Sequence, residues 1–524
     1  MKHYSSIPAV CYTALSCAAV APLITSCEQA KAEVKPKPNV IVILADDMGV
    51  GDMSVYGSKA ITTPNLDKLA NEGVRFNRGY ASSATSTPSR YALMTGEYPW
   101  KNPNAKILAG DAPLLVRTDQ YTLPKMMQGA GYTTAAIGKW HLGMGDGNVD
   151  WNEQISPSAN DIGFDYSCLI AATNDRVPTV FVENGKVLGL EANDPLYVNY
   201  KKNFEGEPTA ITNPEMLKME WDHGHNQSIM NGIPRIGYQK GGKAAMWVDE
   251  DMADYFVNKV KDYVTENKDK PFFLYYGLHE PHVPRAPHSR FVGKTDLGPR
   301  GDAVVEADWC VGELIAHLEK EGLLENTIVI YSSDNGPILN DGYKDMALDN
   351  AAKHDQLAGL RGGKYSLFEG GTRVPFMIYW KGHIEPLVSD AMVCQIDIMP
   401  SIAALLDIEV PAMDGENHLD AFLGKSQEAR STLVHEANGK LSYRSGKWGM
   451  IPPYKGAAFN TTKSIDMGND SQLTLWDLEA DPTQQNNVAE QNPEVVKKLL
   501  AEFTEITKGY YNPKAADFVF GAKK

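Results

Sequence analysis

Short apolar runs, each followed by polar residues, set the pattern of this chain. Residues 39–45 and 327–331 are continuous runs rich in Val and Ile, which is typical of strands buried on both faces of a parallel sheet. Further strands are predicted at residues 74–81, 132–137, 272–276 and 376–380. Helical patterns occupy residues 64–71, 89–95, 121–129, 244–267, 303–320 and 390–406, the last interrupted near Pro400. Because strands and helices alternate, the sequence predicts an α/β fold with a mainly parallel sheet.

The pattern changes near Gly424. Short strands are predicted at residues 433–436, 441–443, 447–451 and 473–478, followed by an amphipathic helix at 493–508. Strands this short and closely spaced are typical of a small antiparallel sheet. We therefore predict a main domain at residues 39–424 and a C-terminal subdomain at residues 425–524.

The first 27 residues have the features of a targeting segment. Lys2 and His3 precede a mostly apolar stretch over residues 7–24, and Ile24-Thr25-Ser26-Cys27 resembles a lipobox. Lipidation of Cys27 would tether the mature protein through the polar residues 28–38. We expect an exported protein, periplasmic or at the cell surface, that touches the membrane through a lipid anchor at most. The alternative is an ordinary cleaved signal in which Cys27 is incidental.

Charge and cysteine content exclude two classes of protein. A formal net charge of -16 argues against nucleic-acid binding, because affinity for phosphate backbones needs a basic face. Of the six cysteines, Cys168, Cys310 and Cys394 follow the targeting segment. Their wide spacing gives no metal-binding or disulfide pattern, so buried free thiols are expected.

Pairs of residues with oxygen-bearing side chains follow two of the apolar strands. Asp46-Asp47 comes directly after residues 39–45, and Asp334-Asn335 follows the strand at 327–331. Because parallel strands place their carboxyl ends at one edge of a sheet, we expect both pairs to meet there. Clustered hard oxygen donors suit Ca²⁺, whereas solvated strand ends are the alternative for either pair alone.

The segment from Ser86 to Gly96 predicts an anion site. Pro88 suits the first turn of a helix that Gly96 ends, so Ser86 would lie just before the helix N-terminus. Free backbone N–H groups there favour an anion, and Arg90 adds a forked donor. The segment can present a nucleophile to a sulfate- or phosphate-like group. A plain Ser-Pro helix cap is the alternative.

Basic side chains gather in three further motifs. Lys139 and His141 lie two residues apart at a predicted strand end, in Gly138-Lys139-Trp140-His141. His282 follows the strand at 272–276, and Lys364 ends a Gly-Gly-Lys segment. Histidine can transfer protons near neutral pH because its ordinary pKa lies close by.

Together these motifs resemble the type I sulfatases. The match includes Ser86-x-Pro88-Ser89-Arg90 with Thr95-Gly96, the Gly-Lys-x-His and Gly-Gly-Lys segments, and Leu475-Trp476-Asp477-Leu478. In that family the residue at position 86 is oxidised to formylglycine by a maturation enzyme, so this chain resembles a serine-type member. The resemblance implies an alkaline-phosphatase-like α/β sandwich, with a large mixed sheet between helices, and hydrolysis of a sulfate ester.

Residue roles follow from the same resemblance. The implied Ca²⁺ ligands are Asp46, Asp47, Ser86, Asp334 and Asn335. The implied catalytic residues are Ser86 as formylglycine, Arg90, Lys139, His141, His282 and Lys364. Of these, Lys139 and Lys364 would neutralise the sulfate, His282 and Lys364 would protonate the leaving alcohol, and His141 would assist release of sulfate.

The substrate is expected to be a sulfated sugar of a host or algal glycan. Residues 150–240 show little periodicity and are expected to form a substrate-recognition insert. Its expected sugar contacts are Asn174, Arg176, His223 and His225, together with His279 outside the insert. We predict an exo-acting enzyme for galactose or N-acetylgalactosamine 6-O-sulfate.

Two other functions remain open from the sequence. A metal-dependent phosphomonoesterase or phosphodiesterase of the same superfamily would use a plain Ser or Thr with two transition metals. An inactive glycan-binding lipoprotein would bind without turnover. Activity with Ca²⁺ alone separates the first from a sulfatase, and turnover separates the second.

Overall fold

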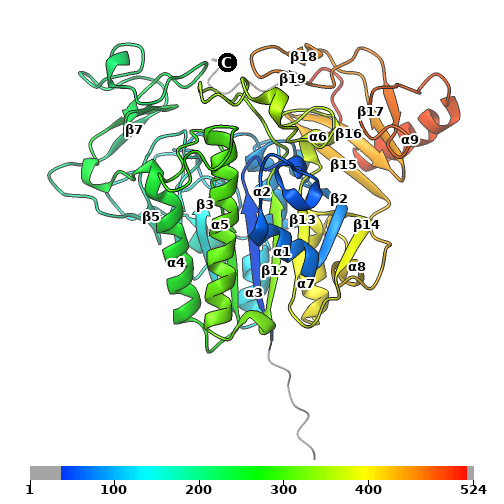
Figure 1. Ribbon diagram of the computed structural model, residues 1–524, viewed down its shortest axis with the longest axis horizontal. Helices are drawn as coiled ribbons and strands as arrows, with labels where there is room; N and C mark the ends of the chain where they lie inside the picture. Colours follow the sequence, from blue (N-terminus) through cyan, green and yellow to red (C-terminus); the bar gives the residue numbers. More distant parts are fainter. Residues whose placement is uncertain (1–36, 516–524) are drawn as a thin grey trace, which may run out of the picture. The chain divides into compact units, whose positions relative to one another are not determined.

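The strand at residues 39–45 lies inside a ten-stranded sheet (Figure 1). The computed structural model describes residues 37–515, so the targeting segment, most of the tether and Cys27 lie outside the described residues. The strands follow one another across the sheet as β14 (Leu387–Cys394), β2 (Val74–Tyr80), β13 (Phe376–Tyr379), β12 (Thr327–Ser333), β1 (Asn39–Ala45), β11 (Phe272–Gly277), β3 (Thr133–Lys139), β4 (Tyr166–Ile170), β5 (Val182–Glu183) and β6 (Lys186–Val187). Only β13 and β5 run against the other strands of this sheet.

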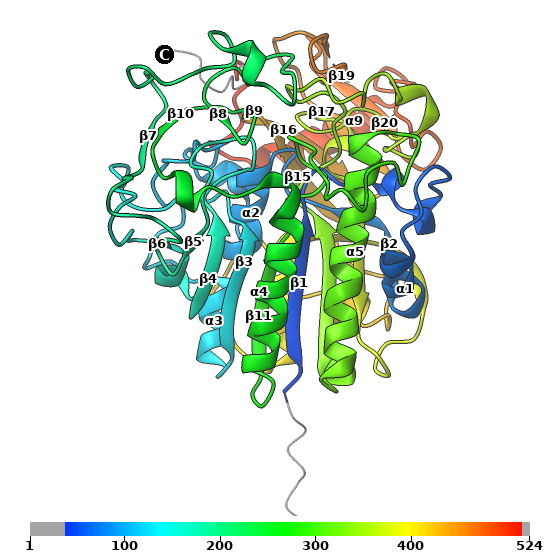
Figure 2. The ribbon, with the colours of Figure 1, turned by 60° about the vertical axis from the view of Figure 1, so that its left-hand side comes forward.

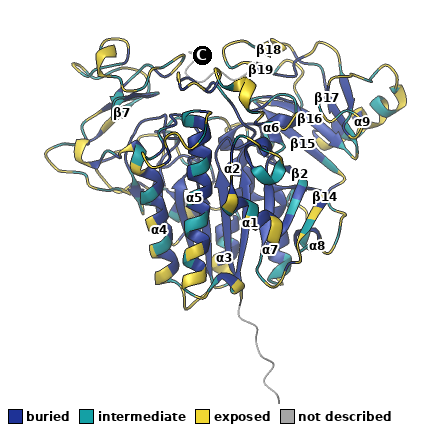
Figure 3. Ribbon diagram, viewed as in Figure 1, coloured by how far each residue is buried: buried dark blue, intermediate teal, exposed yellow. Residues whose placement is uncertain are grey.

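Both faces of the sheet are covered by helices, which explains the unbroken apolar sequence of β1. Val40, Val42 and Leu44 pack into one apolar cluster, and Ile41 and Ile43 pack into the other. The first cluster includes side chains of α2 (Ser86–Thr95), α3 (Leu123–Gly129), α7 (Ile398–Leu405) and α8 (Leu419–Phe422). The second includes side chains of α1 (Pro64–Glu72), α4 (Met252–Glu266) and α5 (Pro299–Lys320). Figures 2 and 3 show α4 and α5 covering one face of strands that are buried throughout.

The C-terminal region forms its own small antiparallel sheet. Its strands are β15 (Thr432–Ala437), β16 (Lys440–Ser445), β17 (Trp448–Ile451) and β20 (Thr474–Asp477). The helix α9 (Pro493–Ile506) packs on it through the buried Leu499 and Phe503. A two-stranded ribbon, β18 (Phe459–Asn460) and β19 (Ile465–Asp466), projects from the same region. The predicted large mixed sheet between helices with a small antiparallel sheet is confirmed.

The segment at residues 150–240 has two parts. Its first part contributes β4, β5 and β6 to the edge of the main sheet. The remainder holds loops and short strands, β7 (Tyr197–Asn199) with β10 (Tyr238–Lys240), and β8 (Ile229–Met230) with β9 (Ile233–Pro234). Among residues 37–515, no helix is both long and apolar enough to cross a membrane.

Two predicted helices differ most from the structure. Residues 387–394 form the strand β14, which pairs with β2, so the helix predicted at 390–406 begins only at Ile398. A short apolar run fits either element, and tertiary pairing decided in favour of the strand. Pro400 lies in the first turn of α7, where proline is tolerated, and does not interrupt it. The helix predicted at 244–267 begins at Met252, after two 3₁₀ turns at Lys243–Ala245 and Asp249–Asp251.

The three cysteines of the described residues are buried free thiols, as predicted.

Candidate active site

Four adjacent parallel strands end at one place and carry most of the predicted site. In the order β12, β1, β11 and β3, their carboxyl ends lead into Asp334-Asn335, Asp46-Asp47, the loop of His279 and His282, and Lys139. The register pairs Ala45 with Ser333 and Leu44 with Gly277, so these ends lie side by side. The prediction that the two acidic pairs meet at one sheet edge is confirmed.

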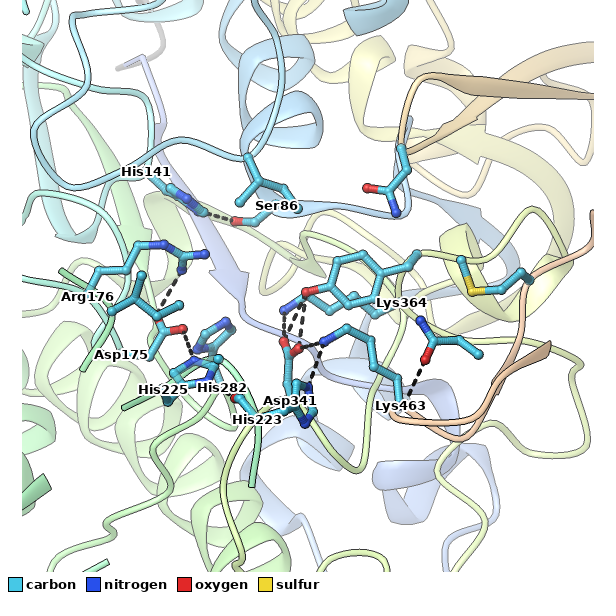
Figure 4. A pocket seen from close by; sticks show the side chains of 17 residues that line it. Ser86, His141, Asp175, Arg176, His223, His225, His282, Asp341, Lys364 and Lys463 are labelled. Atoms are coloured by element: carbon cyan, nitrogen blue, oxygen red, sulfur yellow. Dashed lines mark hydrogen bonds and ion pairs between the residues drawn. The ribbon is translucent and has the colours of Figure 1, made fainter. Parts of the chain in front are cut away.

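Helix α2 brings Ser86 to this edge. The helix begins three residues before the predicted start at residue 89, so Ser86 is its first residue, after the N-cap Thr85, rather than a residue just before it. Ser86 still lies at the positive end of the helix. Its hydroxyl Oγ lies 3.0 Å from Arg90 Nε. It also lies 3.1 Å from His141 Nδ1 (Figure 4). Gly96 ends the helix with a φ of 69°, as the sequence predicted. A buried group at position 86 therefore lies between a guanidinium and an imidazole.

The acidic residues fit a bound cation. Asp46 Oδ1 and Asn335 Oδ1 are buried and have no hydrogen-bond partner among the described residues. Asp46, Asp47 and His282 each offer a ligand atom within 4.8 Å of the others. Unpaired buried oxygens are costly unless a cation or a donor satisfies them. Carboxylate and amide oxygens are the ligands that Ca²⁺ prefers.

Three cations balance the three carboxylates. Arg90 Nη2 lies 2.9 Å from Asp334 Oδ2, and Lys364 Nζ lies 2.9 Å from Asp47 Oδ2. Lys139 Nζ pairs with Asp46 and lies 3.5 Å from Asp334. Because these charges cancel, the charge of a metal ion bound here would be left to neutralise an anionic substrate.

The pKa values of these groups follow from their burial and their neighbours. Burial raises the pKa of Asp46 well above its ordinary value, although Lys139 opposes the shift. Burial acts in the same direction on Asp334, but the charges of Lys139 and Arg90 hold its pKa well below the ordinary value. Burial and the nearby Lys364 lower the pKa of His282 to about 3. His282 is thus neutral in the free enzyme at neutral pH.

Two residues of the site adopt a backbone conformation that is unusual for them. Asp47 has a φ of 63° and His141 a φ of 58°. A left-handed conformation outside glycine costs on the order of 1–3 kcal/mol, so surrounding contacts must hold it. Asn335 Nδ2 donates to Asp47 Oδ1 at 2.7 Å, and Thr87 Oγ1 donates to the His141 carbonyl at 2.9 Å. These contacts fix the two side chains that face Ser86 and the acidic cluster.

Ser86 lines a cavity of about 320 Å³ (Figure 4). We call the residues at the sheet edge the floor: Asp46, Asp47, Ser86, Arg90, Lys139, His141, His282, Asp334, Asn335 and Lys364. We call the following residues the walls: Asp175, Arg176, His223 and His225 from the insert, with Asp341, Tyr365 and Lys463 opposite. Of the floor residues, Ser86, His141, His282 and Lys364 line the cavity directly.

The walls consist largely of ion pairs. Asp175 Oδ1 lies 2.9 Å from Arg176 Nη1, and Asp175 Oδ2 lies 2.8 Å from His225 Nε2. On the other side, Asp341 pairs with Lys463. Each wall therefore combines one carboxylate with one permanently charged cation, and the surface above the floor is close to neutral.

The expected sugar contacts divide into two groups. Arg176, His223 and His225 line the cavity. Asn174 and His279 do not; both line a smaller polar cavity on the other side of His282. Asn174 Nδ2 donates to the Pro284 carbonyl at 3.3 Å, so this side chain supports the loop that carries His282.

Three wall residues carried no functional prediction from the sequence. Asp341 follows the Asp334-Asn335 motif by only seven positions, which is the one local signal that could have pointed to it. Tyr365 adjoins Lys364, and Lys463 comes from the β18–β19 ribbon of the C-terminal region. A single Lys in a polar loop gives no motif, so only the fold brings it to the cavity.

Comparison with known proteins agrees with this geometry. Residues 38–408 match the family model for sulfatase, and residues 363–509 match the model for the N-sulphoglucosamine sulphohydrolase C-terminal region. N-acetylgalactosamine-6-O-sulfatase of Bacteroides thetaiotaomicron is 46% identical over 495 residues, which cover 93% of this chain and 97% of that protein. Human arylsulfatase A is 31% identical over 496 residues, which cover 88% and 86%.

Comparison with solved structures agrees with the family match. A protein from work on the metabolism of multiple glycosaminoglycans by B. thetaiotaomicron superposes with a TM-score of 0.88 at 46% identity, covering 90% of this chain and 99% of that one. The predicted alkaline-phosphatase-like fold and sulfuric ester hydrolase activity are confirmed. Sulfatases work with a formylglycine and a metal ion, and the floor contains a residue and a set of oxygens that fit both. The chain belongs to the sulfatase family.

Proposed function

We propose that this sulfatase is exo-acting and removes the 6-O-sulfate from a terminal galactose or N-acetylgalactosamine of a glycan. The observation that best supports this reaction is the position of Ser86. It is buried at the cavity floor between Arg90 and His141 and beside the acidic cluster. Oxidation of Ser86 to formylglycine by a maturation enzyme supplies an aldehyde hydrate as nucleophile, which an ordinary serine hydroxyl cannot match. Asp46, Asp47, Asp334, Asn335 and the residue at 86 would hold calcium, which would supply fixed positive charge.

The chain's own residues bind and polarise the sulfate. Lys364 lines the cavity, so its ammonium group can donate to a sulfate oxygen, whereas Lys139 is completely buried and pairs with Asp46 next to the expected metal site. Arg90 is completely buried and fixes the group at position 86 through Nε. Preorganised charge of this kind is usually the largest single contribution to catalysis.

Two residues can supply the proton that the leaving alcohol needs. His282 Nδ1 donates to the Val283 carbonyl at 2.6 Å, so Nε2 is the nitrogen free to act. A bound sulfate anion favours the charged form of a neighbouring imidazole and so raises the low pKa of His282. Lys364 is the second donor, and His141, in contact with position 86, assists release of sulfate afterwards.

The cavity supports a single sugar as the unit that is recognised. Its volume of about 320 Å³ lies near the lower end of small-molecule pockets, roughly 300–1,000 Å³. The balanced ion pairs of the walls favour a sugar whose remaining groups are uncharged hydroxyls or an acetamide. Similarity to N-acetylgalactosamine-6-O-sulfatase supports the same substrate class.

We further propose that the mature enzyme is exported and lipid-anchored through Cys27 in the periplasm or at the cell surface. The basic start, apolar stretch and lipobox-like Ile24-Thr25-Ser26-Cys27 support this. Metabolic labelling with a fatty-acid probe should mark the wild type and not Cys27→Ala.

A screen of positional isomers tests the substrate. Purified enzyme carrying formylglycine is incubated with the 2-, 3-, 4- and 6-O-sulfated forms of galactose and N-acetylgalactosamine, and released sulfate is measured. We expect kcat/KM for the 6-O-sulfated sugars to exceed that for the other isomers by at least about 100-fold. Equal rates with all isomers, or a preference for another position, would contradict the proposed specificity.

A further inference from the structure

Three loops that are far apart in sequence meet at the mouth of the cavity. Asn340 Nδ2 donates to Asp222 Oδ2 at 2.8 Å and to the Thr462 carbonyl at 3.1 Å. The Asp222 amide donates to the Gly342 carbonyl at 2.8 Å. The insert, the segment after β12 and the β18–β19 ribbon are therefore joined by direct hydrogen bonds at this point.

Asp341 is the centre of this junction (Figure 4). Its carboxylate lies 3.0 Å from Lys364 Nζ, accepts from the Tyr365 hydroxyl at 3.1 Å, and pairs with Lys463 Nζ. Both oxygens are engaged and the residue is 6% exposed. Asp341 therefore has little capacity left to bind a substrate hydroxyl and must act through its neighbours.

Lys364 is held from two sides. Its ammonium group donates to Asp47 Oδ2 at 2.9 Å and to Asp341 Oδ2 at 3.0 Å. An ammonium group has three donors, so one N–H remains for a group in the cavity that Lys364 lines. Without Asp341 the flexible lysine side chain would keep one fixed contact, and its free N–H would lose its direction.

The chain around Lys364 shows that this placement is enforced. Tyr365 has a φ of 74°, a genuine outlier for a bulky aromatic residue. Its amide donates to the Ala84 carbonyl at 2.9 Å, two residues before Ser86, and its hydroxyl reaches Asp341. Strain of this kind persists only where surrounding contacts over-determine the conformation, and it gathers at functional sites.

We propose that Asp341 is a positioning residue for Lys364 and that Lys463 holds Asp341 in place. The β18–β19 ribbon of the C-terminal region thereby takes part in turnover without contacting the sulfate. This inference rests on the proposed function, because it assigns Lys364 to binding the sulfate and protonating the leaving group. It adds a role for Asp341 and Lys463 to that mechanism.

A double-mutant cycle tests the coupling. The variants Lys364→Ala, Asp341→Asn and the double variant are prepared with formylglycine, and kcat and KM are measured with an aryl sulfate and a sugar sulfate. We expect Lys364→Ala to lower kcat by about 100-fold and Asp341→Asn by about 10-fold. In the Lys364→Ala background, Asp341→Asn should change kcat by less than about 2-fold.

Two further measurements separate positioning from a merely structural role. KM should change by less than about 3-fold in Asp341→Asn, because the contacts that bind substrate and transition state equally well are retained. The effect on kcat should be larger for the sugar sulfate than for the aryl sulfate, since an aryl leaving group needs less help from a proton donor.

Lys463→Met provides a second variant on a partly exposed residue, in case Asp341→Asn does not fold. It should lower kcat about 5-fold, again only when Lys364 is present, whereas Lys463→Arg should keep near-normal activity. The matched control is Lys344→Met, which removes an exposed lysine of the same junction that pairs with Glu220 at 3.0 Å. It should leave kcat unchanged.

The outcomes distinguish this inference from the proposed function. If the wild type is active and the losses of kcat in Asp341→Asn and Lys364→Ala multiply in the double variant, the inference is overturned and the proposed function is not. If the enzyme acts on other sulfate esters and the expected coupling between Asp341 and Lys364 is measured, the proposed substrate is wrong and the inference is supported. A wild type with formylglycine but no activity on any sulfate ester would overturn both.

Discussion

The floor and the walls of the cavity are built in different ways. Most floor residues lie at or next to strand ends or in the first turns of α2, whereas His282 and Lys364 lie in loops; Asp46, Lys139 and Asp334 are completely buried. Wall residues come from loops, and the side chains of His223 and Lys463 remain about a quarter and a fifth exposed, at 25% and 21%. The register of the strands fixes where residues at the sheet edge lie, whereas loops can change in sequence and conformation without disturbing the sheet.

This difference separates chemistry from selectivity. The floor supplies charge to a sulfate group, which is the same in every sulfate ester. In the proposed function the walls meet the rest of the substrate, and hydrogen bonds of Asn340 join the insert to the C-terminal region beside them. We therefore expect changes in the floor to lower activity on every substrate, and changes in the walls to act mainly on sugars.

Of the changes to the floor, removal of the proposed calcium ion should lower activity the most. Chelation should lower kcat by on the order of 100-fold or more on aryl and sugar sulfates alike, because the acidic cluster loses the charge that faces the substrate. The melting temperature should also fall, since a cation that binds only the folded state stabilises it. Calcium should restore both. Full activity in a sample shown by elemental analysis to hold no metal would contradict this account.

His282→Ala should have the second-largest effect on activity. We expect a loss of about 100-fold in kcat on sugar sulfates with little change in melting temperature, because the imidazole transfers a proton and lines the cavity floor. His383→Ala, at an exposed position, is the matched control and should be silent. Near-normal turnover in His282→Ala would remove this residue from the mechanism.

His225→Ala should have the smallest effect and should be selective. His225 lines the cavity and is held by Asp175 at 2.8 Å. Its two ring nitrogens are engaged by the His223 carbonyl and Asp175, so the ring can act on a sugar through packing and through its hold on Asp175. Loss of these contacts should lower kcat/KM about 10-fold for the sugar sulfate, and an aryl sulfate should be hydrolysed as before. Equal losses on both substrates would place His225 in the common chemistry instead, and so break the distinction between floor and walls.

The same distinction explains what the sequence could predict. Asp46, Asp334 and Lys139 lie at or just after the ends of apolar runs and Ser86 lies at a helix start, so the local pattern predicted where they lie, and the parallel sheet brought them together. Asp341 and Lys463 are 122 residues apart, and each looks like an ordinary surface charge in a polar loop. No periodicity encodes a contact between two loops, so their pairing emerges only from the folded chain.

Element boundaries failed where local pattern was ambiguous. Residues 390–394 are compatible with a strand or a helix, and their pairing with β2 made them a strand. Asn174 and His279 were grouped with the sugar contacts because polar clusters in loops look alike in sequence. Their side chains instead line the small polar cavity that His282 separates from the substrate cavity.

The most direct test of the central claim is the mass of the peptide that contains position 86, from protein purified out of its native host. The account predicts a peptide two hydrogens lighter than the encoded serine form, in a preparation that releases sulfate. A Ser86→Ala variant should show no such species and no turnover. A fully active preparation whose peptide carries only unmodified serine would contradict the formylglycine mechanism.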